Sequence, residues 1–199
     1  DGLVLREFPR PVPAPGEAVQ VKAEIELDGL VSAFLYYDAG SGYQAVPLFS
    51  DGLHEDSAAG DETFTASIPG HEAGTLVRYY IEAAGTGGAV RFFPTEAPAY
   101  GRGWRVSDPS DTSPLVRDEL ILEPRQLQLF YNFPYDRERQ TYGSCLLDGV
   151  LYETVRIRLR GRASRDFAKK NWRIDFPKSH LWNGVRRRKT VRNRHAPGF

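Results

Sequence analysis

Short runs of alternating apolar and polar residues, separated by turn-forming residues, constrain this chain more than any other feature. In residues 18–25 every second residue is apolar, which is the pattern of a strand with one buried face. Further strand-like runs follow at 31–39, 43–49, 62–68, 75–84 and 89–97. Pro47 should place its strand at a sheet edge. Six short strands with turn signals at roughly 8–12-residue intervals predict a β-sandwich of immunoglobulin or fibronectin III type at 1–106.

The chain changes character after this first block. Residues 107–116 are rich in Ser, Asp, Thr and Pro, which is the composition of a linker. A short strand is expected around 119–123, and Pro124 should begin a helical turn with Leu127, Leu129, Phe130 and Phe133 on its apolar side. Asp148-Gly149 is a typical hairpin turn between two strands.

The strands after residue 150 predict an antiparallel sheet with a basic outer face. In the first strand, Val155, Ile157 and Leu159 alternate with Arg156, Arg158 and Arg160. The next strand repeats the pattern, with Trp172, Ile174 and Phe176 pointing inward and Asn171, Arg173 and Asp175 pointing outward.

The composition is that of a folded chain. Of the 199 residues, 41% are hydrophobic and 26% are charged, so a packed core can form. The 26 basic and 26 acidic residues balance, but residues 185–199 contain six basic residues and no acidic one. No apolar run approaches the roughly 18 residues of a membrane-spanning helix. Since the chain has no Met, we expect it to be a processed or excised piece of a longer protein.

The common catalytic and metal-binding motifs are absent from the sequence. The histidines do not pair with another His or Cys at metal-ligand spacing. There is no G-x-S-x-G, H-E-x-x-H or Walker A pattern. The single cysteine, Cys145, lies within a predicted strand, which favours a small buried side chain over a nucleophile.

An acidic, Gly-rich loop contains Asp51, Asp56 and Asp61. Calcium binds several carboxylate and carbonyl oxygens from one flexible loop, so these residues are a candidate calcium site. Their spacing does not match the EF-hand pattern. The favoured alternative is that the Asp side chains accept hydrogen bonds from backbone N–H groups in turns.

The hairpin between Arg158 and Phe176 is the strongest candidate for a binding site. The candidate residues for binding phosphate or nucleotide are Arg158, Arg160, Gly161, Ser164, Lys169 and Lys170. A glycine at the hairpin tip and a lysine on the next strand also hold nucleotide in the small lobe of kinases. On spacing alone, a solvated hairpin whose charges prevent aggregation is favoured. A nucleic-acid-binding sheet is disfavoured because the chain before residue 185 is acidic overall.

Residues 147–184 resemble the N-terminal part of the CotH-type kinase family, the atypical kinases related to spore coat protein H. The matching residues are Tyr152, Val155, Ile157, Arg158, Arg160, Gly161, Ser164, Lys169, Lys170, Trp172, Arg173, Ile174 and Phe176. The preceding segment is similar to the opening strand, helix and hairpin of that family. The resemblance therefore covers about residues 117–184.

This resemblance implies an α+β kinase-like small lobe at 117–184, whose basic hairpin faces the phosphates of ATP. It implies that Lys170 or Lys169 contacts these phosphates and that acids of a later lobe hold Mg²⁺. It also implies phosphorylation of serine in a protein substrate, by a protein outside a bacterial cell, on its surface or on its spore. The family's kinase domain is much longer than this segment, so we expect a truncated lobe that is inactive alone.

Residues 51–83 are similar to β-sandwich modules that often precede such domains in secreted or surface bacterial proteins. That similarity implies that Asp51, Gly60, Asp61 and Phe64 shape a loop. The alternative function is therefore a non-enzymatic extracellular adhesion or structural module, in which the sandwich is the working part.

Residues 185–199 depart from the family, which usually continues into another alternating strand. Their near lack of apolar periodicity predicts a disordered or frameshifted tail, and the alternative is a polybasic tail that binds phosphate or an anionic surface. The complete prediction is a mainly β chain with minor α content: a sandwich at 1–106, a linker at 107–116, a truncated small lobe at 117–184 and the tail. No nucleic-acid partner is expected.

Overall fold

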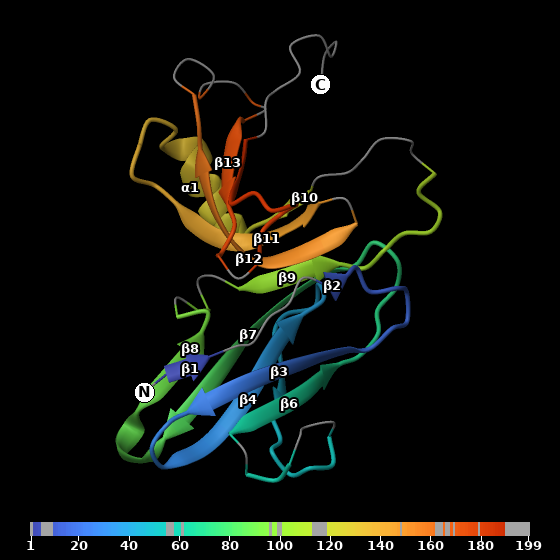
Figure 1. The fold of residues 1–199 in the computed structure, drawn as a ribbon, viewed down its shortest axis with the longest axis vertical. Coiled ribbons are helices and arrows are strands. Elements are labelled where there is room, and N and C mark those ends of the chain that lie inside the picture. The colour runs from blue at the N-terminus through green and yellow to red at the C-terminus, as the bar shows by residue number, and fades with distance from the viewer. Residues whose placement is uncertain are drawn as a thin grey trace.

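The fold is mainly β, with strands arranged in three antiparallel sheets (Figure 1). The structure is a computed structural model that describes residues 2–4, 10–54, 58–60, 62–95, 97–98, 101–112, 119–147, 149–161, 165, 168, 170–178 and 180–189. The mainly β content with minor α content confirms the coarse prediction. None of the described helices combines the length and apolarity that a membrane span requires.

Two sheets form the first block. One has the order β1 (Gly2–Val4), β3 (Val19–Glu26) and β6 (Thr63–Ile68). The other has the order β5 (Gln44–Pro47), β4 (Leu30–Asp38), β7 (Leu76–Gly85) and β8 (Val90–Phe93), and β9 (Arg102–Arg105) also pairs with β7. A short 3-10 helix, η1 (Thr86–Gly88), joins β7 to β8. As Pro47 predicted, β5 lies at a sheet edge.

The two sheets of the first block share one hydrophobic core. Alternate residues of β3 enter it, as the sequence predicted, and are Val19, Val21, Ala23 and Ile25. The second sheet contributes Leu35, Val77, Tyr79, Ile81 and Trp104. Burial of these apolar faces is the main term that holds the two sheets together.

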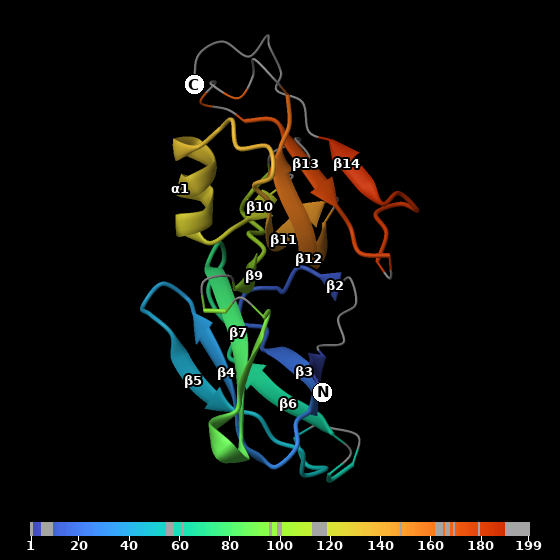
Figure 2. The same cartoon turned by 90° about the vertical axis from the view of Figure 1, so that its left-hand side faces the viewer.

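The third sheet forms the second block, with the order β10 (Glu119–Ile121), β11 (Thr141–Leu147), β12 (Val150–Leu159), β13 (Trp172–Asp175) and β14 (Arg187–Lys189). The helix α1 (Pro124–Asn132) lies on one side of it, away from β14 (Figure 2). Phe130 joins Val155, Ile157 and Ile174 in a second core and packs edge-on against Trp172. The prediction that Val155, Ile157 and Ile174 point into the core is confirmed.

The predicted apolar side of α1 is only partly right. Phe130 is buried, but Gln126 is the other buried residue of the helix, while Leu127 and Phe133 are 38% and 54% exposed. Gln126 and Phe130 are four residues apart and share the face toward the sheet. The helix ends at Asn132, so the non-helical backbone of Phe133 turns its side chain outward.

A β-bulge in β12 changes which residues of this strand face each of the two cores. Gly143 pairs with Val155, whereas Cys145 pairs with Tyr152, so two residues of β12 lie opposite Ser144. Before the bulge, Leu151 packs into the core of the first block and Tyr152 into the core of the second, and after the bulge Val155 also belongs to the second core. The bulge therefore shifts the alternation of β12 by one residue, so that Val155 faces the same core as Tyr152.

The two blocks are joined by backbone pairing and by buried polar contacts. β2 (Arg10–Pro11) pairs with β12, although it precedes the first block's sheets in the sequence. The Tyr79 hydroxyl donates to Glu153 Oε1 at 3.1 Å, and Gly103 N–H donates to Ser144 Oγ at 3.1 Å. Residues 107–112, from the predicted linker, contain no helix or strand.

Part of the predicted tail belongs to the sheet. Residues 187–189 form β14, and a tight turn at Asn183-Gly184 precedes it. Both turn residues have positive φ, 45° and 73°, and Val185 N–H donates to the Trp182 carbonyl at 2.7 Å. Asn-Gly is the dipeptide that such two-residue turns favour. Residues 190–199 lie outside the described part of the chain.

Candidate functional site

A cavity of about 420 Å³ lies beside the tip of the β12–β13 hairpin. It is lined by Tyr135, Arg137, Gly161 and Arg165. The first two come from the connection between α1 and β11, and the other two come from the connection between β12 and β13. The fold therefore brings together two loops that are more than 20 residues apart in the sequence.

Arg165 links these two loops. Its Nε donates to the Gly161 carbonyl at 2.7 Å, and its Nη1 donates to the Pro134 carbonyl at 3.0 Å. These bonds use two of the five N–H donors of the guanidinium and fix its plane at the cavity. Gly161 has a φ of +94°, a backbone conformation that glycine adopts without strain.

The lining of the cavity favours an anion. Among the described residues that line it are the cationic side chains of Arg137 and Arg165, and none of these residues is a carboxylate. A planar guanidinium recognises phosphate or carboxylate oxygens through paired hydrogen bonds. Two arginines from separate loops can therefore hold one anionic group between them.

Lys170 lies behind this cavity. Its side chain is only 7% exposed, and Nζ donates to the Arg165 carbonyl at 2.5 Å. The same nitrogen lies 4.8 Å from the centre of the Tyr131 ring, and the Tyr131 hydroxyl donates to the Ala168 carbonyl at 3.1 Å. Lys170 therefore holds the hairpin loop against α1 and supports the backbone of Arg165.

The other predicted phosphate-binding residues are distributed along the hairpin. Gly161 lines the cavity, whereas Arg158 lies on β12 opposite Arg173 of β13. Arg160 donates its backbone N–H to the Asn171 carbonyl at 2.9 Å, just beyond the paired strands. Ser164 and Lys169 lie outside the described residues.

Sequence reasoning did not select three residues of the cavity: Tyr135, Arg137 and Arg165. Arg165 could have been chosen because it lies in the hairpin loop itself. Tyr135 and Arg137 follow a helix and carry no motif, so only the tertiary structure shows that they meet the hairpin.

One of the three aspartates in the acidic loop accepts a backbone hydrogen bond in a turn, as the favoured alternative predicted. Asp51 accepts the backbone N–H of Leu53 at 2.9 Å, and His54 Nδ1 lies 2.9 Å from its other oxygen. The hydrogen bond with His54 lowers the pKa of Asp51 below its ordinary value. Asp56 and Asp61 lie outside the described residues. Within the residues that the structure describes, no group of three or more His, Cys, Asp or Glu could hold a metal ion.

The prediction that Cys145 is a small buried side chain is confirmed, because it is fully buried in the second core.

No protein-family model matches this chain, and no curated protein matches its sequence. The cavity beside the hairpin is the feature of the described structure whose chemistry is best defined, as a cationic site for an anionic group.

Proposed function

We propose that this chain is part of a CotH-like secreted or surface protein kinase, with the cavity beside the β12–β13 hairpin as the site for ATP phosphates. The observation that carries this proposal is that Arg137 and Arg165, from separate loops, line one cavity whose described lining contains no carboxylate. The motif resemblance over residues 117–184 supports the same assignment.

The order of the strands supports the assignment of a fold type to each of the two blocks. The orders β1-β3-β6 and β5-β4-β7-β8 around one core are compatible with a sandwich of immunoglobulin or fibronectin III type. The five-stranded path β10 to β14 with α1 on one side is compatible with an α+β small lobe. We assign the sandwich to the β1–β9 region and the small lobe to the β10–β14 region.

In this proposal the chain orients the phosphates rather than transforming them. Arg165 is already held by the Gly161 and Pro134 carbonyls, so little side-chain freedom is lost when a phosphate binds. Arg137 supplies the second cation. Lys170 acts as a positioning residue, because its ammonium group holds the Arg165 carbonyl.

The described lining of the cavity fits a phosphate group better than a magnesium ion. Arginines suit phosphate oxygens, whereas Mg²⁺ requires carboxylate or other oxygen ligands, and no carboxylate is among the lining residues that the structure describes. ATP with Mg²⁺ would supply the phosphoryl group that a kinase transfers. That acids elsewhere in a full-length protein hold Mg²⁺ stays a prediction, as do the serine substrate and the bacterial surface or spore location.

Thermal unfolding with added ligands tests the proposal. ATP, with or without Mg²⁺, should raise the melting temperature, and adenosine at the same concentration should not, because it lacks phosphates. Stabilisation by calcium but not by ATP would contradict the proposal and favour the extracellular adhesion module.

A further inference from the structure

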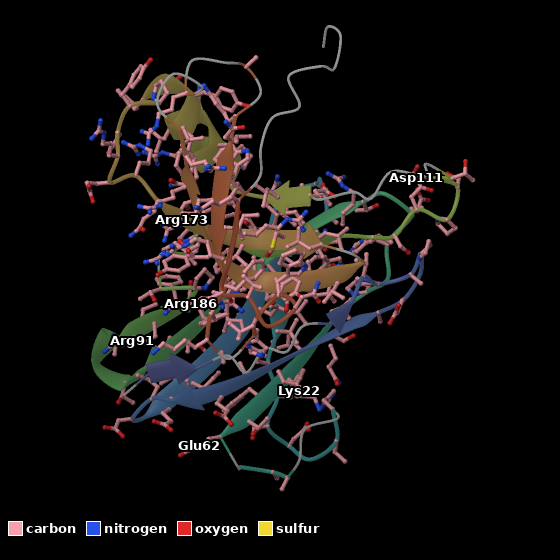
Figure 3. All side chains as sticks on the ribbon, turned by 45° about the horizontal axis from the view of Figure 1, so that its top comes forward. Lys22, Glu62, Arg91, Asp111, Arg173 and Arg186 are labelled. Carbon is pink, nitrogen blue, oxygen red and sulfur yellow. The ribbon has the colours of Figure 1, made fainter. Side chains whose placement is uncertain are left out.

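The outer face of β12, β13 and β14 concentrates positive charge. Residues that pair across neighbouring strands point to the same face, and the pairing defines two rows. The first row is Arg158, Arg173 and Lys189, and the second is Arg156, Asp175 and Arg187. Figure 3 shows Arg173 well away from Glu62 and Lys22 of the first block.

The first row places like charges directly opposite one another. Neighbouring strands lie only about 4.8 Å apart, and like charges in facing positions destabilise a sheet. In the second row, Asp175 is the one acid, and its side chain is 7% exposed. It lies 2.6 Å from Arg187, 2.8 Å from Arg173 and 3.8 Å from Arg156. One carboxylate is thus shared by three arginines, and the face keeps a large positive excess.

The same face ends at a sheet edge. β14 is the last strand in the order of the described sheet, and Arg187 and Lys189 are exposed on it. An edge strand offers backbone N–H and C=O groups to another strand. Cations at the edge repel a basic strand and attract an acidic one, so they select the partner rather than prevent pairing altogether.

We propose that the edge of β14 binds an extended acidic segment of another protein by strand addition. In an extended segment, alternate side chains share one face at about 6.6 Å spacing, as Arg187 and Lys189 do on β14. Acidic residues at alternate positions would therefore face these two cations. This inference is independent of nucleotide binding at the cavity.

The charge pattern argues against a second copy as the partner. Among the strands that the structure describes, β3 carries alternating acids, Glu24 and Glu26. Both sides of β3 are already paired, with β1 and with β6, so this strand cannot add to another sheet. No described strand of a second copy is thus both acidic at alternate positions and free to add to β14, which favours a strand from a different protein as the occupant.

Fluorescence anisotropy with three labelled peptides tests the proposal in the full chain. The first is a ten-residue peptide of alternating Glu and Val, the second has the same composition with the glutamates in one block, and the third is the alternating peptide with backbone N-methyl groups. The alternating peptide should bind at low salt, and the other two should bind at least about tenfold more weakly, since strand addition requires both the spacing and the N–H groups.

Two variants define the surface. Lys189→Glu should weaken binding of the alternating Glu-Val peptide by about tenfold. It should also create binding of an alternating Lys-Val peptide, because the edge charge is reversed. Arg91→Glu, which changes an exposed arginine on β8, is the matched control and should leave binding unchanged. Circular dichroism should show that both variants fold.

Three results would overturn the proposal. Equal binding of the block or N-methylated peptide would show that only charge is recognised. Tighter binding of a thymidine oligonucleotide, weakened by Lys189→Glu, would assign the face to nucleic acid. Absence of peptide binding at low salt would show that the edge is simply solvated.

Discussion

The ammonium nitrogen of Lys170 lies 4.8 Å from the centre of the Tyr131 ring and donates to the Arg165 carbonyl. This contact joins the hairpin loop to α1. The sequence pattern does not indicate that these two segments lie side by side. In the structure, the Lys170 ammonium group holds the backbone of Arg165 at the cavity. The family resemblance implies a different role for Lys170, direct contact with phosphate.

Replacing Lys170 should reduce stability more than it reduces nucleotide affinity. Lys170→Met keeps the length of the side chain but removes the partly buried hydrogen bond to Arg165, which is worth about 1.5–3 kcal/mol when one partner is charged. Urea denaturation should show this loss in the free energy of unfolding. Unchanged stability combined with loss of ATP binding would instead show that Lys170 contacts the phosphates directly.

Tyr131 should contribute through both its ring and its hydroxyl. Tyr131→Phe removes the bond to the Ala168 carbonyl and should cost about 1 kcal/mol. Tyr131→Leu also removes the cation–π contact with Lys170, for about 0.5–1 kcal/mol more. Tyr142→Phe, at an exposed tyrosine of β11, is the control for denaturation measurements. Equal costs for the two Tyr131 variants would contradict a role for the ring.

Asp175 should make the stability depend on pH in the acid range. Burial raises the pKa of Asp175, but hydrogen bonds from Arg187 and Arg173 outweigh this effect, so its pKa lies below the ordinary value. Since the unfolded state then binds more protons, the stabilisation is complete above the ordinary pKa of about 3.9. It is lost as the pH falls through the lower pKa of the folded state.

Comparison with Asp175→Asn isolates this contribution. The variant should be less stable than the parent at pH 7 by about 1.5–3 kcal/mol, the usual range for hydrogen bonds to charged groups. The difference should shrink as denaturation is repeated toward pH 3. A difference that stays constant over this range would show that Asp175 acts through packing rather than charge.

The junction between the blocks should depend on the charge of Glu153. Arg102 and Glu153 are both buried there, and burial lowers the pKa of Arg102 to about 9 while the Glu153 carboxylate raises it. Glu153→Gln removes that carboxylate and should cost about 3 kcal/mol, because it leaves a buried cation without its nearby negative charge. Tyr79→Phe removes the hydrogen bond to Glu153 but keeps the carboxylate, and should cost about 1 kcal/mol. Equal losses in thermal or urea unfolding would argue against the charge effect.

The sequence predicts elements well where local pattern and tertiary environment agree. Alternation in β3 and in the second half of β12 identifies the buried residues, since each side of these strands has one environment. The bulge opposite Ser144 could not be predicted, because it appears only when β11 and β12 are paired. The buried position of Gln126 likewise depends on where the sheet lies, not on its own polarity.

The strand β14 could have been found from the sequence. Its residues lack apolar periodicity because they occupy an edge with an exposed face, but the preceding Asn183-Gly184 dipeptide is a strong hairpin signal. The candidate site was only partly predictable. Gly161 could be chosen from its hairpin position, whereas Arg137 becomes relevant only because the α1–β11 connection folds against that hairpin.

The most direct test of a phosphate site at the cavity is the affinity of the Arg137→Gln variant for ATP, measured by isothermal titration calorimetry. Arg137 is exposed at the cavity, so this change should leave stability unaltered, and Arg91→Gln on β8 is the matched control. We predict that Arg137→Gln weakens ATP binding by about tenfold or more, the effect of losing one charge-assisted hydrogen bond, while Arg91→Gln does not. Equal ATP affinity in both variants and the parent chain would contradict a phosphate site at this cavity.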